Sequence, residues 1–266
     1  MDQVLVLLAV SVTATLAAPL LVGEARWQIH RPQLALFAWL AVFTLGVLTL
    51  GSAVMLAIGV STGLVPHQDD HHTPWDHTVL ALGAWAALGL VGAILVMVAR
   101  GFERIRAERL QVDAAVTSVS DGATVYDGDY EYVIVPSPEP AAFSIPGPEP
   151  TVAVTQGLVD TVTSAELSAV LAHERAHLRY RHGAIIALAD LNAACVPWLS
   201  AARRFAASAR LLIELIADDV AVRQVGAADL ISALSHPSIA RTDPAAQLRA
   251  VRLSRRNPAR QSRQSR

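Results

Sequence analysis

The chain has 266 residues, of which 53% are hydrophobic and 17% charged, and its formal net charge is −2. Its mean hydropathy of +0.41 is too high for an ordinary soluble domain of this size. This composition predicts a mainly α-helical membrane protein, and the near-neutral charge gives no sign of direct binding to nucleic acid.

Three apolar runs in the first 110 residues are long enough to cross a bilayer, at about 4–22, 34–60 and 78–99. No basic residue precedes the first run, so we interpret it as a span and not as a signal peptide. Arginines occur in the first loop and after the third run, but not in the second loop. The positive-inside rule therefore predicts an external N-terminus and places everything after residue 99 in the cytoplasm.

The second loop gathers histidines and aspartates within residues 67–77. These are good ligand types for a zinc ion, but their spacing matches no closed tetrahedral site. A solvated polar loop is therefore the preferred interpretation, and metal or proton sensing is the alternative.

Residues 111–160 change to the composition of a small soluble subdomain. Two runs, 123–126 and 130–135, flank the turn residues 127–129 and predict a hairpin, while residues 151–155 predict another strand. Between them, prolines break up an expected loop around residues 142–145. A strand at this place can hold an extended peptide by main-chain hydrogen bonds or can serve simply for packing, and both interpretations stay open.

Residues 164–181 predict one helix that carries His173, Glu174 and His177 as HExxH. Histidines four residues apart lie on one face of a helix and can share one metal ion. Glu174 then lies beside that metal, where a carboxylate can take a proton from the attacking water and pass it to the leaving amine. Thr163 and Glu166 have the spacing of a capping box at the start of this helix.

A catalytic zinc usually has three protein ligands, so a further ligand is expected downstream. Residues 184–199 are too short and too polar for a clear span, and we interpret them as a re-entrant or buried helix, with a full fourth span as the alternative. Glu214 is the predicted third ligand, and Asp218, one turn later, is predicted to accept a hydrogen bond from a ligand histidine. His182, five residues after His177, is expected to point away and to face solvent or the lipid interface.

The run AVLAHERAHLRYRH, followed by an apolar stretch with Pro197 and Trp198 and then by ELIADDVAV, resembles a known family. It is similar to the membrane zinc metallopeptidases of the beta-lactam sensor-transducer (antirepressor) type, and more broadly to gluzincin proteases of the Ste24 and HtpX type. The resemblance implies one Zn²⁺ per chain on His173, His177 and Glu214, acid and base work by Glu174, and support from Asp218. Those sensors continue into an extracellular penicillin-binding domain, whereas this sequence ends soon after the motif, so any sensing is expected to use the second loop, the spans or a partner protein.

Three regions are expected: a transmembrane region at 1–110, a small α+β zinc protease domain at 111–226 and a basic tail at 227–266. The predicted function is that of a membrane zinc metalloendopeptidase. It would cleave a protein or peptide at the cytoplasmic face, and the resemblance suggests a transcriptional repressor as substrate. The alternative is a non-catalytic membrane signalling or scaffold protein whose zinc site is structural or vestigial and whose arginines from 249 to 266 bind a partner or anionic lipid.

Overall fold

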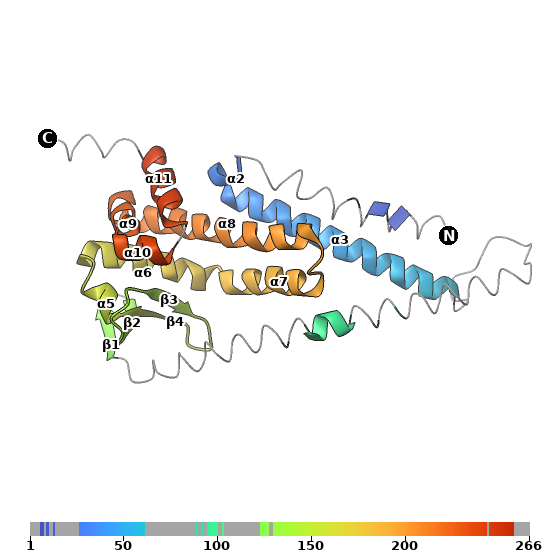
Figure 1. Ribbon diagram of the computed structural model, residues 1–266, viewed down its shortest axis with the longest axis horizontal. Coiled ribbons are helices and arrows are strands. Elements are labelled where there is room, and N and C mark those ends of the chain that lie inside the picture. Colours follow the sequence, from blue (N-terminus) through green and yellow to red (C-terminus); the bar gives the residue numbers. More distant parts are fainter. Residues whose placement is uncertain are drawn as a thin grey trace, which may run out of the picture. The chain divides into compact units, whose positions relative to one another are not determined.

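The computed structural model describes residues 27–61, 123–127, 130–243 and 245–257, together with short fragments between residues 6 and 13 and between 89 and 103 (Figure 1). Most residues of the predicted spans at 4–22 and 78–99 lie outside these described residues, and the loop at 67–77 lies wholly outside them. The chain forms two compact units. The first contains Met1–Gln28, Leu34–Arg106 and Ala189–Ser208, and the second contains Ile29–Gln33, Ala107–Leu188 and Ala209–Arg266.

The short helix α2 (Trp27–His30) is followed by the long apolar helix α3 (Pro32–Ser61). Among the described residues, α3 supplies the one stretch long and apolar enough to cross a membrane, Pro32–Leu56, which contains most of the span predicted at 34–60. Phe37 and Met55 are 70% and 69% exposed, so the described residues leave much of this apolar helix surface uncovered. An uncovered apolar surface of this length suits a lipid environment.

A four-stranded sheet, ordered β1-β2-β4-β3, belongs to the second unit. Strands β1 (Ala123–Asp127) and β2 (Tyr130–Val135) form the predicted antiparallel hairpin. Strand β4 (Thr151–Thr155) also lies where the sequence predicts it, parallel to β2.

The fourth strand, β3 (Ala142–Ile145), occupies the segment that we expected to be a loop. It pairs antiparallel with β4 and forms an edge of the sheet, which places β4 in the sheet interior. The prolines at positions 140 and 146 end the strand without interrupting it, because they lie just outside its ladder. The edge that a peptide can reach is therefore β3 and not the predicted strand at 151–155.

A one-turn helix, α5 (Gln156–Val159), leads into the predicted HExxH helix, α6 (Ser164–Arg179). The capping box is present: Glu166 N–H donates to Thr163 Oγ1 at 3.3 Å, and Thr163 N–H donates to the Glu166 carboxylate at 2.8 Å. The helix ends two residues earlier than expected, before Arg181, whose φ of 52° is left-handed. Because α6 ends early, the residues after Arg181 do not continue its helical spacing.

Helix α6 is buried on more than one side. Leu167 and Leu171 pack against the sheet together with Val152 and Val154. Small residues face the helices instead, and Ala176 packs against α8 (Ser200–Val225). Its partners there are Ala217 and Val220 of α8.

Between α6 and α8 lies α7 (His182–Cys195), a 14-residue apolar helix. At about 1.5 Å per residue, 14 residues are too short to cross the ~30 Å hydrocarbon core. The chain leaves the second unit within α7 and returns to it within α8. Glu214 and the two histidines therefore belong to the same unit.

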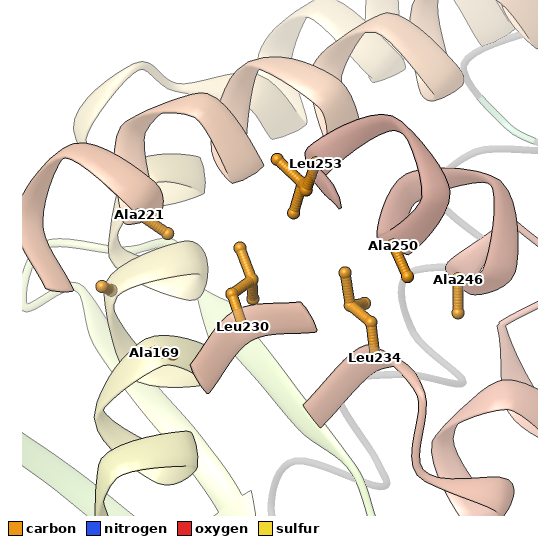
Figure 2. Close-up of a cluster of buried hydrophobic side chains, with 8 residues drawn as sticks. Ala169, Ala221, Leu230, Leu234, Ala246, Ala250 and Leu253 are labelled. Atoms are coloured by element: carbon orange, nitrogen blue, oxygen red, sulfur yellow. The ribbon is translucent and has the colours of Figure 1, made fainter. Parts of the chain in front are cut away.

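The predicted basic tail is folded where it is described. Residues 227–257 form α9 (Ala227–Leu234), α10 (Pro237–Thr242) and α11 (Ala246–Arg256). Figure 2 shows the reason: Leu230 and Leu234 of α9 point toward Leu253 of α11, and this cluster rests on Ala169 of α6. Burial of these apolar side chains outweighs the tendency of a basic segment to stay solvated. The second unit thus continues past residue 226, which differs from the predicted domain boundary.

Candidate metal centre

The structure brings the three predicted metal ligands together. His173 and His177 project from one face of α6, with their Nε2 atoms 3.1 Å apart. Glu214 of α8 places Oε2 3.2 Å from His173 Nε2 and Oε1 3.6 Å from His177 Nε2. Among the described residues, these three form the group of His, Cys, Asp and Glu side chains that can hold a metal ion.

The spacing of these atoms fits zinc. Four ligands placed tetrahedrally at 2.0–2.1 Å from Zn²⁺ lie about 3.3 Å from one another. The observed separations of 3.1, 3.2 and 3.6 Å bracket that value. Two imidazoles with one carboxylate are also a common ligand set of catalytic zinc, which leaves a fourth position open.

Asp218 lies one turn after Glu214 on α8 and is fully buried. Its Oδ1 is 3.0 Å from Nδ1 of His173, the ring nitrogen that faces away from the other ligands. A carboxylate in this place fixes the tautomer and the orientation of a ligand histidine. The geometry is therefore the one that the sequence predicted for this pair.

Arg249 of α11 is part of the site, although sequence reasoning assigned it to a tail. Its guanidinium binds Asp218 through Nε and Nη2 at 2.9 and 2.6 Å, and it binds Glu214 Oε2 through Nη1 at 2.9 Å. Nη1 also reaches Asp243 at 2.7 Å. Arg249 is 5% exposed, as is Arg252, which pairs with Asp219, so neither side chain is free to bind a partner or anionic lipid.

A signal for Arg249 was present in the sequence. Ala246, Ala250 and Leu253 recur at helical spacing, and this recurrence predicts a buried face in the segment assigned to the tail. Arg249 lies within that apolar pattern and not opposite it. A basic residue on the buried face of a helix needs buried acidic partners, which Asp218 and Glu214 supply.

His182 is the clearest correction to the site residues. We expected it to face solvent or lipid, but it is 2% exposed and its Nδ1 lies 3.3 Å from Nδ1 of His177. The expectation assumed that the HExxH helix continued to residue 181. The helix ends at Arg179 and the chain turns, so helical spacing does not apply to His182.

Glu174 borders a cleft of about 830 Å³ that also reaches His173, His177, Glu214 and Arg249. Burial raises the pKa of Glu174, and the charge of His173 partly offsets this rise. A carboxyl group with a raised pKa is better able to carry a proton near neutral pH than an ordinary surface glutamate.

The edge strand β3 forms one wall of this cleft. Thr155 N–H donates to the Ala141 carbonyl at 2.9 Å, and the alternation of an antiparallel ladder then turns the main-chain groups of Ala142 and Ser144 away from β4. Burial raises the pKa of Glu174, and the backbone of Ser144 lies close enough to its carboxyl group to offset this rise slightly. The outward edge of β3 thus runs beside the candidate proton carrier.

The protonation states of His177 and Glu214 suit metal binding, whereas His173 must first release a proton. Burial lowers the pKa of His177 to about 4, so this ring is neutral and offers a lone pair. Burial alone would lower the pKa of His173, but hydrogen bonds to Asp218 and Glu214 raise it to about 9. Burial would raise the pKa of Glu214, but His173 and Arg249 hold it at about 2, which keeps the carboxylate ionised. Burial lowers the pKa of His182 to about 4, so this ring is also neutral.

Comparison with known proteins agrees with this geometry. The sequence model of peptidase family M48 matches residues 106–235. A 57-residue segment, 21% of this chain, is 44% identical to the plastoglobule-localized metallopeptidase 48, chloroplastic, of Arabidopsis thaliana, and spans 17% of that protein. No solved structure matches the chain. The match to M48, together with the His173, His177 and Glu214 cluster, supports a zinc metallopeptidase of the M48 type.

Proposed function

We propose that this protein is a zinc metalloendopeptidase with one Zn²⁺ per chain, held by His173, His177 and Glu214. The observation that carries the proposal is the convergence of two Nε2 atoms and a carboxylate within 3.1–3.6 Å on the wall of a cleft. The similarity of residues 106–235 to peptidase family M48 supports the same reaction class.

When bound, the zinc ion supplies polarisation of the scissile carbonyl and acidification of the attacking water. The protein's own side chains transfer the proton and position the ligands. Glu174, which follows the first ligand directly, takes the proton of the water and delivers it to the leaving amine. Its raised pKa and its position on the cleft support both steps. Asp218 and Arg249 hold the ligands in place.

We further propose that the substrate lies extended along β3. The outward main-chain groups of Ala142 and Ser144 can pair with a peptide strand by β-augmentation. Such pairing reads the peptide backbone and tolerates many side chains, which suits an endopeptidase. A substrate held there passes beside Glu174, which lines the same cleft as β3.

We place the enzyme in the cell membrane as a multi-pass protein, with the catalytic unit on the cytoplasmic side. The apolar helix α3 and the distribution of arginines support this location. The sequence resemblance to antirepressor proteases suggests a regulatory role in which a transcriptional repressor is cleaved. A sensor protein would then supply the signal.

The test uses the full chain purified in detergent. We expect one zinc ion per wild-type chain and cleavage of an unstructured protein such as casein. Glu174→Gln should keep the zinc while its cleavage rate falls by about 10²–10⁴-fold. Glu214→Ala should lose zinc far more readily during a mild chelator challenge, because one of three protein ligands is gone.

Two outcomes would overturn the proposal. Full proteolysis by the Glu174→Gln variant would remove Glu174 from the mechanism. Wild-type protein that binds no zinc after reconstitution would favour the non-catalytic signalling alternative.

A further inference from the structure

Each candidate ligand histidine has a partner on the ring nitrogen that faces away from the other ligands. For His173 the partner of Nδ1 is the Asp218 carboxylate at 3.0 Å. For His177 the partner of Nδ1 is the Nδ1 atom of His182 at 3.3 Å. An imidazole that binds a metal through Nε2 carries its proton on Nδ1, so both Nδ1 atoms are donors and both need acceptors.

His182 can provide that acceptor. A neutral imidazole has one N–H and one lone pair, and the tautomer protonated on Nε2 leaves the lone pair on Nδ1. The two rings are nearly perpendicular, at 87°, with their centroids 5.0 Å apart. His182 is 2% exposed, so water does not compete for this position.

A bend in the backbone after α6 places His182 next to His177. Tyr180 caps α6, Arg181 adopts a left-handed φ of 52°, and α7 begins at His182. A left-handed conformation costs a residue with a Cβ on the order of 1 kcal/mol. On a continuous helix, a side chain five positions after His177 would point to another face, so this bend is what makes the contact.

We propose that His182 is a positioning residue for the metal site: it accepts the Nδ1–H of His177 and thereby fixes the tautomer and the ring orientation of that ligand. This inference rests on the zinc site proposed above. In this arrangement the two ligand histidines donate to different kinds of acceptor, because Asp218 is an anion and His182 is a neutral ring. Both supports are buried, and they come from different helices, α8 and α7.

The test compares two substitutions in the full chain. In His182→Asn, the amide oxygen takes the place of Nδ1 and still accepts. His182→Leu has a similar volume but no acceptor. Zinc dissociation constants are measured by competition with a chromophoric chelator, which requires no catalytic turnover. We expect the leucine variant to lose about 10–100-fold in zinc affinity and the asparagine variant to stay close to wild type.

A spectroscopic measurement separates orientation from packing. In protein loaded with Co²⁺, the Nδ1–H protons of the two ligand histidines give strongly shifted, exchangeable proton signals. One of these signals should move or broaden by faster exchange in His182→Leu, and it should return in His182→Asn. The signal from His173 should change little, because Asp218 still accepts from it.

Circular dichroism of the metal-free variants shows whether each one folds. If the leucine variant does not fold, His182→Ala replaces it in the same comparison with asparagine. The inference would be overturned if the leucine or alanine variant bound zinc as tightly as wild type. It would also be overturned if the asparagine variant bound zinc as weakly as the leucine or alanine variant. The proposed function is tested separately, by the zinc content and proteolysis of wild type and Glu174→Gln, both of which keep His182. Failure of the inference can therefore be distinguished from failure of the proposed function.

Discussion

Arg249 and Asp218, 31 residues apart in the sequence, form a buried two-pronged ion pair with N···O distances of 2.9 and 2.6 Å. The same Asp218 carboxylate lies 3.0 Å from His173, and the same guanidinium binds Glu214. Helix α11 thus supports two of the three candidate ligands, although it lies beyond the segment that matches peptidase family M48. Helix α11 is therefore part of the candidate metal centre.

Removal of the arginine should weaken both the fold and the site. Arg249→Met leaves the fully buried Asp218 without its cationic partner, and breaking such a pair costs about 3–5 kcal/mol. We expect a loss of this order in the free energy of unfolding of the metal-free protein, together with weaker zinc binding.

Arg255→Met is the matched control for this variant, because Arg255 lies on the same helix and is exposed. It should change the unfolding free energy by less than about 0.5 kcal/mol. Denaturant titration in detergent measures both variants. If the two variants had the same free energy of unfolding, the buried ion pair would not contribute significantly to stability.

The packing of α11 gives a second prediction. Leu253 is 1% exposed and contacts the α9 leucines in the cluster of Figure 2. Leu253→Ala should lower the unfolding free energy by about 2–5 kcal/mol, because it creates a cavity in a packed core. Leu248→Ala, at a position 43% exposed on the same helix, should have a much smaller effect. If both variants melt like wild type, α11 is not part of the cooperative core.

Zinc affinity should rise with pH. Burial alone would lower the pKa of His173, but its hydrogen bonds to Asp218 and Glu214 raise it to about 9, so the metal-free protein must release a proton before this ring can bind. We expect the apparent affinity to increase about tenfold per pH unit between about pH 5 and pH 8, with one proton released per zinc. Calorimetry in buffers of different ionisation enthalpy counts the protons. A count of zero would contradict the prediction.

The folding stability of the metal-free protein should fall with rising pH over part of this range. The pKa of His173 is raised from 6.5 to about 9, so the stability that it contributes is complete below about pH 6.5 and is lost as the pH rises to about 9. The pKa of Glu214 is lowered from 4.5 to about 2, so its contribution is complete above about pH 4.5 and is lost on acidification toward pH 2. The pKa values of His177 and His182 are lowered from 6.5 to about 4, so the stability that depends on these neutral rings is complete above about pH 6.5 and is lost as the pH falls to about 4. Denaturation measured across pH in the presence of chelator should therefore find a maximum near pH 6.5. A maximum above pH 8 would contradict these shifts.

The bend after α6 can be tested through its backbone. Arg181 is exposed and has a left-handed φ of 52°, which glycine adopts without strain. Arg181→Gly should therefore leave the unfolding free energy unchanged or raise it by up to about 1 kcal/mol. Arg179→Gly, in the last turn of α6, should lower it by up to about 1 kcal/mol. Thermal or denaturant unfolding compares the two, and the reverse order would indicate that the Arg181 side chain makes a stabilising contact.

Features that depend on neighbouring residues could be predicted from the sequence. The start of α6, its capping box, the hairpin of β1 and β2, and the shared face of His173 and His177 all follow from spacing and from local backbone preference. Glu214 could be named as the candidate third ligand because a carboxylate inside an apolar helix is costly unless it has a partner. The place of β3 was missed because its flanking prolines indicated a loop, whereas pairing with β4 decided the outcome.

The tertiary structure alone decided what surrounds the ligands. Arg249 reaches His173 across 76 residues of sequence, and no local pattern encodes a contact of that range. His182 reaches His177 because one residue, Arg181, takes a left-handed conformation that helical spacing does not foresee. A helical period places side chains on a face of their own helix, but the partner across that face depends on how the helices pack. The ligand spacing could therefore be predicted from the sequence, whereas the hydrogen bonds and charges that hold the ligands depend on the folded chain.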